Sequence, residues 1–256
     1  MNCGTKEKDP GKRERTAVSC AAVLAAFSFL FLLYAAVKTS PYRLLRPYAL
    51  IGKTLPEKLG AETKTIAGRK AVLIPGNDET DAFFIDQIPV TVSDYQKCVK
   101  SGGCAAAHYR NEFSKYTKNP LYGIFPVTFV TWNEARNYCV LRGGDLPTEK
   151  QWEAAAGDGD YAWGSSYPSI AKANIDGWYQ SQTPAGWLPS GASPYGILDM
   201  NGNVREWVLD ENENGEKGLK GGGFQDTWTA ARSESVYYHA PESSGFNRGF
   251  RCAYEQ

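Results

Sequence analysis

An uncharged stretch near the N-terminus constrains this chain more than any other feature. Residues 17–37 read AVSCAAVLAAFSFLFLLYAAV and contain no charged side chain. As a helix at about 1.5 Å per residue, this stretch spans roughly 32 Å, enough for a bilayer hydrocarbon core of about 30 Å. A cleaved signal peptide is the alternative, but its apolar core is usually about 7–15 residues long, and Leu33 and Tyr34 are poor cleavage-site residues. We therefore predict an uncleaved transmembrane anchor.

Basic residues flank the predicted anchor unequally. Positive charge favours the cytoplasmic side, so the larger number of basic residues before the anchor predicts a cytoplasmic N-terminus and a single pass through the cell (inner) membrane. We expect a tail over residues 1–16, a proline-containing linker over 38–66 and a periplasmic or otherwise extracytoplasmic domain over 67–256. The basic residues are Lys6, Lys8, Lys12, Arg13 and Arg15 before the anchor, and Lys38, Arg43 and Arg46 after it.

The charge balance excludes some functions. The chain has 28 Lys+Arg and 28 Asp+Glu, a formal net charge of +0, whereas nucleic-acid binding needs an excess of basic groups to neutralise phosphates. The only histidines are His108 and His239, too few for a multi-histidine iron or zinc centre. The sequence therefore predicts no nucleic-acid partner, and a membrane contact through residues 17–37.

Four of the six cysteines lie in the predicted outer domain: Cys98, Cys104, Cys139 and Cys252. An even number in an oxidising compartment suggests two disulfides, and four buried free thiols are the alternative. A zinc site is disfavoured because no pair has C-x-x-C spacing. Cys98 and Cys104 are close together and flank residues 101–103, so we expect a local disulfide between them.

The domain is predicted to contain short strands, three short helices and long loops. Three stretches have helix-start signals, a hydroxyl side chain followed three residues later by Glu or Gln. They are residues 92–100, with Ser93 and Gln96, and the helices that begin at Thr131 and Thr148. Residues 157–195 show almost no period, which in a compact domain usually indicates function or a bound ion. Strands are predicted at 72–74, 83–85, 204–208, 219–224 and 250–254.

Residues 210–215, DENENG, match the start of a calcium-binding EF-hand loop. That loop requires a bidentate Glu at its twelfth position, where this chain has Gly221. We therefore interpret the segment as a solvated acidic hairpin loop.

A series of short motifs follows in a telling order: FFID at 83–86, PVTFVTW at 126–132, LPTE at 146–149, AWG at 162–164, GILDMNGNVREW at 196–207, KGGGF at 220–224 and GFRC at 249–252. Together they resemble the sulfatase-modifying-factor family, also called the formylglycine-generating enzyme family, over about residues 70–255. The resemblance implies an α+β fold of the C-type-lectin-like kind, with little regular secondary structure and small twisted sheets.

The resemblance also implies structural calcium. At the matching positions, Asp199 and Glu206 would supply carboxylates, and Gly202 and Val204 backbone oxygens. This is suitable chemistry because calcium takes about six to eight oxygen ligands, carbonyls included. An Asn-Gly turn between strands with two solvated acids is the alternative. A second calcium is implied at Asn174, Ile175, Asp176 and Trp178, although the family's intervening loop is collapsed in this chain.

The family's oxidases use two cysteines that bind copper(I) as thiolates. The matching positions here are Asp226 and Ala231, so the resemblance assigns no catalytic residue, and we expect no copper site. Soft thiolates, which neither position supplies, are what copper(I) prefers. Cys139 and Cys252 match the family's structural disulfide.

Three functions remain open. The first is a membrane-anchored, catalytically degenerate binding or regulatory module for an unknown protein or small-molecule ligand. The second is a formylglycine-generating or other periplasmic maturation oxidoreductase that relies on a carboxylate, Asp226 or Glu234. The third is a structural component of an envelope complex. A binding module would use an aromatic surface, unless these side chains belong to the core: Trp228, Tyr237, Tyr238 and His239.

Overall fold

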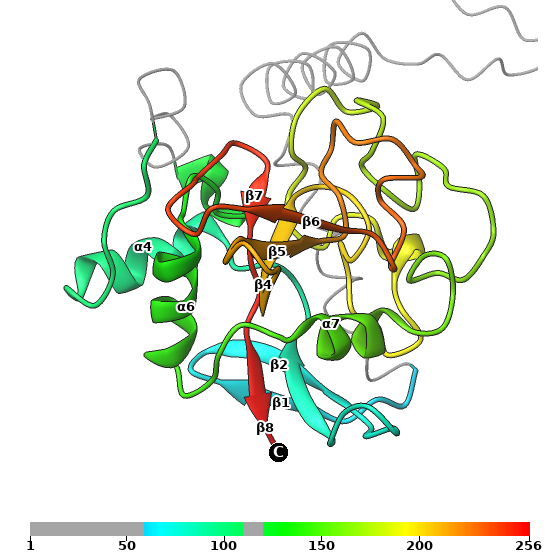
Figure 1. Cartoon of the computed structure of the whole chain (residues 1–256), viewed down its shortest axis with the longest axis horizontal. Helices are drawn as coiled ribbons and strands as arrows, with labels where there is room; N and C mark the ends of the chain where they lie inside the picture. Colours follow the sequence, from blue (N-terminus) through cyan, green and yellow to red (C-terminus); the bar gives the residue numbers. More distant parts are fainter. Residues whose placement is uncertain (1–58, 110–119) are drawn as a thin grey trace, which may run out of the picture. The chain divides into compact units, whose positions relative to one another are not determined.

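A computed structural model describes residues 59–109 and 120–256 (Figure 1). The predicted tail and anchor, residues 1–37, lie outside the described residues. Within the part of the chain that is described, no helix is long and apolar enough to span a bilayer. The elements are β1 (Thr63–Ile66), β2 (Arg69–Ile74), β3 (Phe83–Asp86), α4 (Val92–Lys100), the 3-10 helix Pro120–Ile124, α6 (Trp132–Val140), α7 (Glu149–Ala156), the 3-10 helix Pro189–Gly191, β4 (Arg205–Glu211), β5 (Lys217–Lys220), β6 (Val236–His239), β7 (Arg248–Gly249) and β8 (Ala253–Glu255).

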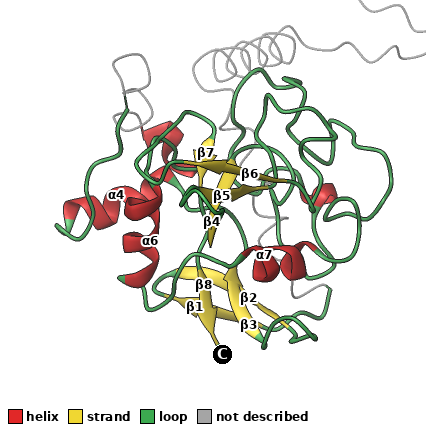
Figure 2. Ribbon diagram, viewed as in Figure 1, coloured by secondary structure: helices red, strands yellow, loops and turns green. Residues whose placement is uncertain are grey.

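Two small four-stranded sheets organise the domain, and loops make up much of the rest (Figure 2). The first sheet has the order β1-β2-β3-β8 and is antiparallel throughout. The second has the order β6-β5-β4-β7, with β4 and β7 parallel. β1 falls within residues 38–66, the predicted linker. The α+β fold with little regular structure is confirmed.

Two predicted strands were wrong in extent. The strand expected at 250–254 is divided, because residues 250–252 carry the chain from β7 in one sheet to β8 in the other (Figure 1). The strand expected at 219–224 ends at Lys220, and the glycine-rich turn that follows leaves the sheet. The acidic loop is confirmed as a hairpin turn between β4 and β5, in which the side chain of Asn212 accepts bonds from the backbone N–H groups of Asn214 and Glu216, both at 3.0 Å.

The helices begin at hydroxyl caps. Capping boxes at Thr131 with Glu134 and at Thr148 with Gln151 confirm the starts of α6 and α7. The cap expected for α4 at Ser93 was wrong. Thr91 is the cap, and its side chain accepts a bond from the backbone N–H of Asp94 at 3.2 Å. Each cap satisfies an N–H group that the first helical turn leaves without a partner.

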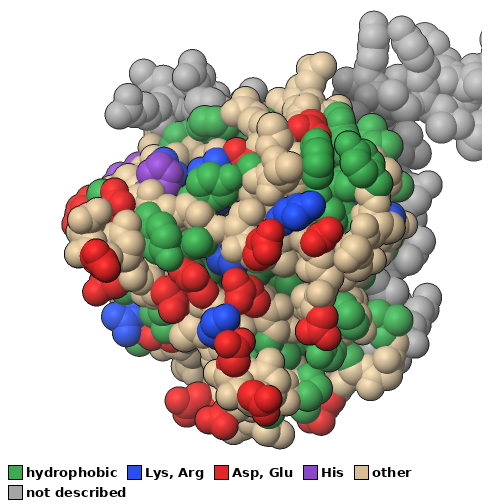
Figure 3. Space-filling view, turned by 45° about the vertical axis from the view of Figure 1, so that its right-hand side comes forward, with side chains coloured by type: hydrophobic (Ala, Val, Ile, Leu, Met, Phe, Trp, Pro, Cys, Tyr) green, Lys and Arg blue, Asp and Glu red, His purple; other side chains and the backbone are tan. Residues whose placement is uncertain are grey.

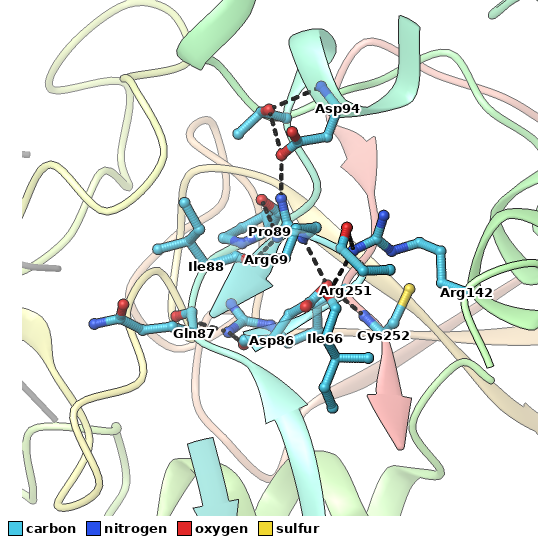
Figure 4. Close-up of polar contacts among 12 residues, drawn as sticks. Ile66, Arg69, Asp86, Gln87, Ile88, Pro89, Asp94, Arg142, Arg251 and Cys252 are labelled. Carbon is cyan, nitrogen blue, oxygen red and sulfur yellow. Dashed lines mark hydrogen bonds and ion pairs between the residues drawn. The ribbon is translucent and has the colours of Figure 1, made fainter. Parts of the chain in front are cut away.

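Buried charges link the two ends of the described domain (Figure 4). Arg69 on β2 donates from Nε to Asp86 on β3 at 3.1 Å and also pairs with Asp94 on α4. Asp86 accepts the backbone N–H of Cys252 at 3.3 Å, and the Asp86 carbonyl accepts Nη1 of Arg251 at 3.1 Å. A buried charge is tolerated only when it is paired and hydrogen-bonded, so these contacts fix how β2, β3, α4 and the C-terminal strands pack.

Both predicted disulfides are present. Cys98 and Cys104 are bonded, with their Cα atoms 5.3 Å apart. Cys139 at the end of α6 is bonded to Cys252 just before β8, with a Cα–Cα distance of 5.4 Å. The first closes the turn after α4, and the second connects α6 to the segment between the two sheets.

Candidate functional site

Asp226, at the position of the family's first cysteine, lies in the loop after β5 and is held on both oxygens. Arg205 on β4 donates from Nε and Nη2 to the two carboxylate oxygens, each at 2.7 Å. The backbone N–H of Gly223 adds a third bond at 2.6 Å. A bidentate arginine–carboxylate pair is among the strongest polar contacts in proteins. Asp226 is therefore positioned as a structural anion for Arg205.

Ala231, at the second cysteine position, is fully buried. It belongs to a small apolar cluster with Ala173 and Ile175. Gly222 approaches so closely that a Cβ atom added there would lie 2.9 Å from the Cα of Ala231, and its φ of +69° also favours glycine. Neither position offers a thiolate, the soft ligand that copper(I) prefers.

The segment expected to bind calcium is a tightly curled loop before β4. Asp199, Gly202 and Asn203 have positive φ values of 57°, 102° and 67°. A Cβ on Gly202 would lie 2.6 Å from the carbonyl oxygen of Asn174, so the loop requires glycine there. Within the described ranges, the carbonyl oxygens of Gly202 and Val204 accept no hydrogen bond. Unpaired buried carbonyls are suitable calcium ligands.

The two carboxylates of that segment differ in burial and in their partners, because Glu206 is buried and Asp199 is half-buried. Asp199 accepts the backbone N–H of Gly186 at 2.7 Å. Burial raises the pKa of Asp199 to about 6, and the Gly186 N–H and Arg251 act in the opposite direction. On Glu206, Oε2 accepts Nε of Arg251 at 2.6 Å and the indole N–H of Trp152 at 2.8 Å.

Glu206 retains one site for a cation. Among the described residues, its Oε1 atom accepts only Nη2 of Arg251, at 2.7 Å, so one lone pair is left. The described residues contain no group of three or more His, Cys, Asp or Glu side chains that could hold a metal. A cation at this loop would therefore depend on the backbone oxygens of Gly202 and Val204 beside Asp199 and Glu206, a set that fits calcium.

The four residues expected at the second calcium site differ in their exposure to solvent. Asn174 and Ile175 are buried, whereas the side chains of Asp176 and Trp178 are exposed. The Asn174 amide donates to the carbonyl of Ser181 at 2.9 Å, and its Oδ1 atom is buried with no donor in the described part of the chain. That buried acceptor has the character of a cation ligand, and a second calcium at these residues stays a prediction.

The four residues of the expected aromatic surface do not all lie on one face. Successive residues on a strand face opposite sides. Tyr238 therefore points away from Tyr237 and His239, and its hydroxyl donates to Glu149 at 3.0 Å. Trp228 lies elsewhere, in a loop, with its ring 5.5 Å from that of Tyr167.

The sequence did not indicate that two arginines lie beside Tyr237 and His239. Parallel pairing of β4 and β7 places Arg205 opposite Arg248. Arg205 lies 4.1 Å above the ring of Tyr237, and Arg248 approaches His239 at 3.4 Å. The only sequence signal was Arg205 within the motif NVREW, because no local pattern predicts pairing between strands so far apart.

Comparison with known proteins agrees with the fold and the motif order. The family described as "Sulfatase-modifying factor enzyme 1-like domain" matches residues 60–256. The chain belongs to this family. Sulfatase-modifying-factor relatives include inactive C-alpha-formylglycine-generating enzyme 2 of Bos taurus, 34% identical over 154 residues, which cover 50% of this chain and 50% of that protein. Hercynine oxygenase of Mycolicibacterium smegmatis is 31% identical over 157 residues, covering 50% of this chain and 37% of that enzyme.

Solved structures of similar fold include PvdO from Pseudomonas aeruginosa, with a TM-score of 0.58, 22% identity and coverage of 77% of this chain and 92% of that one. Treponema denticola variable protein 1 has a TM-score of 0.53 and 16% identity, covering 77% of this chain and 99% of that one. These likenesses establish the C-type-lectin-like fold. The chain matches about half or less of the length of the curated relatives named above.

Proposed function

We propose that this chain is a catalytically inactive member of the sulfatase-modifying-factor family, which acts as a binding or regulatory module anchored to the membrane by residues 17–37, with its domain outside the cytoplasm. The observation that supports it is the replacement of the two thiolate positions by Asp226, which is paired with Arg205, and by the buried Ala231. The similarity to an inactive formylglycine-generating enzyme homologue agrees with this proposal.

The oxidoreductase alternative lacks a suitable carboxylate. Asp226 is bound by Arg205, and Glu234 has a side chain that is 78% exposed, 3.7 Å from Arg232. A catalytic acid or base must be free to exchange a proton with the substrate, whereas Asp226 is occupied by Arg205 and Glu234 extends into solvent. Nucleic acid is not proposed as a partner, because the net charge is +0 and the face drawn in Figure 3 bears scattered acidic groups without a continuous basic stripe.

We predict that the purified full chain forms no formylglycine on a cysteine-containing peptide, even when copper(I) is supplied. Mass spectrometry of the peptide measures the reaction, and an active formylglycine-generating enzyme serves as the positive control. The reason is the absence of a thiolate pair at Asp226 and Ala231. Copper-dependent formation of formylglycine by this chain would overturn the proposal of an inactive module.

We further propose one structural calcium at the loop of Asp199, Gly202, Val204 and Glu206. Calcium at 100 times its dissociation constant would stabilise the fold by about 2.7 kcal/mol, so chelation is expected to lower the melting temperature. Asp199→Asn should reduce this sensitivity, whereas Asp158→Asn, at an exposed position, should leave it intact. A melting curve that chelator does not change in the wild-type chain would refute the calcium site and leave the family assignment standing.

A further inference from the structure

Arg248 on β7 is a half-buried guanidinium that no carboxylate neutralises in the described part of the chain. Its Nη1 atom donates to Oγ of Ser243 at 2.8 Å. Its Nε atom is buried with no acceptor. Its Nη2 atom lies 3.4 Å from both ring nitrogens of His239, and an N–H group cannot point along both ring lone pairs at once. Arginine has five N–H donors, so most of this group's hydrogen-bonding capacity is unused.

Two cations beside this site are already paired with carboxylates. Arg205 lies opposite Arg248 in the parallel pairing, and Asp226 already neutralises it. Lys217, which faces His239 from β5, is paired with Glu211. Among these three cations, Arg248 alone therefore lacks a carboxylate partner in the described part of the chain.

His239 is available as a neutral partner beside that charge. Burial and the positive charges of Arg248 and Arg205 lower the pKa of His239, and Glu216 acts in the opposite direction. A neutral imidazole offers one N–H donor and one acceptor. An anion bound next to it would favour the protonated ring and supply a second charged donor.

We propose that Arg248, together with His239, binds a carboxylate of the module's ligand, while Ser243, whose hydroxyl donates to the Ala240 carbonyl at 2.7 Å, holds the Arg248 side chain in place. A carboxylate has the planar, two-oxygen shape that a guanidinium fork matches, and its single negative charge equals the single positive charge of Arg248. A doubly charged sulfate or phosphate fits less well, because of the two adjacent described arginines only Arg248 lacks a carboxylate partner, and Asp226 already neutralises Arg205. This inference rests on the proposed binding function and names its ligand chemistry.

The two histidines make a direct test practical, because the imidazole NMR spectrum of the full chain contains only His108 and His239. Sodium acetate is titrated against sodium chloride at equal ionic strength, and a His239→Gln variant assigns the signals. Acetate is expected to shift the His239 signal and raise its pKa, while His108, which contacts Glu134 at 2.8 Å, stays unchanged. A short glutamate peptide amide binding more tightly than acetate would identify a protein ligand, and equal binding a small acid.

Variants separate the specific site from a general charge effect. Arg248→Gln should weaken acetate binding by at least about tenfold, since hydrogen bonds to charged groups are strong, and Arg248→Lys should weaken it because the fork is lost. Arg136→Gln is the matched control, because Arg136 is a surface arginine already paired with Asp145 at 3.0 Å.

Three results would overturn the carboxylate site: a His239 signal that responds equally to acetate and chloride, unchanged acetate affinity in Arg248→Gln, or tighter binding of sulfate than of acetate. The comparisons of acetate with chloride and with sulfate use the wild-type chain, so they decide the question even if a variant fails to fold. None of these results changes the formylglycine assay, so failure of this site is distinguishable from failure of the proposed function.

Discussion

Replacing Arg251 with alanine is expected to lower the free energy of unfolding by about 3–5 kcal/mol, the usual cost of leaving a buried charge without its partner. The side chain of Arg251 is fully buried and bonds both oxygens of Glu206, at 2.6 and 2.7 Å. It also donates to the carbonyl oxygens of Asp86, Gln87 and Leu198. Alanine would remove all of these donors and strand the Glu206 carboxylate inside the protein.

Urea-induced unfolding of the full chain, followed by tryptophan fluorescence, measures this loss. Arg136→Ala is the control, because Arg136 and Asp145 form an exposed pair, and such pairs contribute about 0–1 kcal/mol. Similar losses of unfolding free energy in the two variants would contradict the interpretation that the buried pair of Arg251 and Glu206 stabilises the fold.

The double substitution Cys139→Ser and Cys252→Ser is expected to lower the free energy of unfolding by roughly 4–5 kcal/mol, the larger of the two disulfide effects in the domain. The two cysteines are separated by 113 residues, so their disulfide removes much conformational freedom from the unfolded chain. Both cysteines are also fully buried, so the hydroxyl groups of serine would be placed in an apolar environment.

Cys98→Ser with Cys104→Ser provides the comparison. That disulfide spans a separation of only 6 residues, so loop entropy predicts a loss of roughly 2 kcal/mol. Urea midpoints of both double variants under the same conditions measure the difference. An equal or smaller loss for the long-range pair would show that loop length does not govern disulfide stabilisation here.

Local signals in the sequence predicted the local structure. The capping residues Thr131 and Thr148 act within four residues of themselves, and the helices begin there. The N-cap of α4 was misassigned to Ser93. Thr91, two residues earlier, also has a hydroxyl group, and it is the one that accepts the backbone N–H of Asp94. Strand ends were less predictable, because the position where the chain leaves a sheet depends on which partner strand is adjacent.

Polar contacts between distant segments were not predictable from local signals, and the Cys139–Cys252 disulfide was expected only from the resemblance to the family. The pair of Glu206 and Arg251 joins residues 45 positions apart, and that of Arg205 and Asp226 joins residues 21 apart. The sequence motifs contain these charged residues, but they do not indicate which acidic residue pairs with which basic residue. The pairing of β4 with β7 places Arg205 opposite Arg248, and Asp226 in the loop after β5 neutralises only Arg205.

The position of β8 has a consequence for how the domain is made. β3 pairs with β8, so residues 83–85 lie against residues 253–255 in the first sheet. During synthesis, β1, β2 and β3 emerge early but expose the edge of β3 until residues 253–255 have been translated. Such long-range pairing is slow to form and leaves strand edges open to misassembly. The segment 98–104 can form its disulfide early, whereas the Cys139–Cys252 bond can form only after residue 252 has been made, so the first sheet and the long-range disulfide are both completed late in the synthesis of this domain.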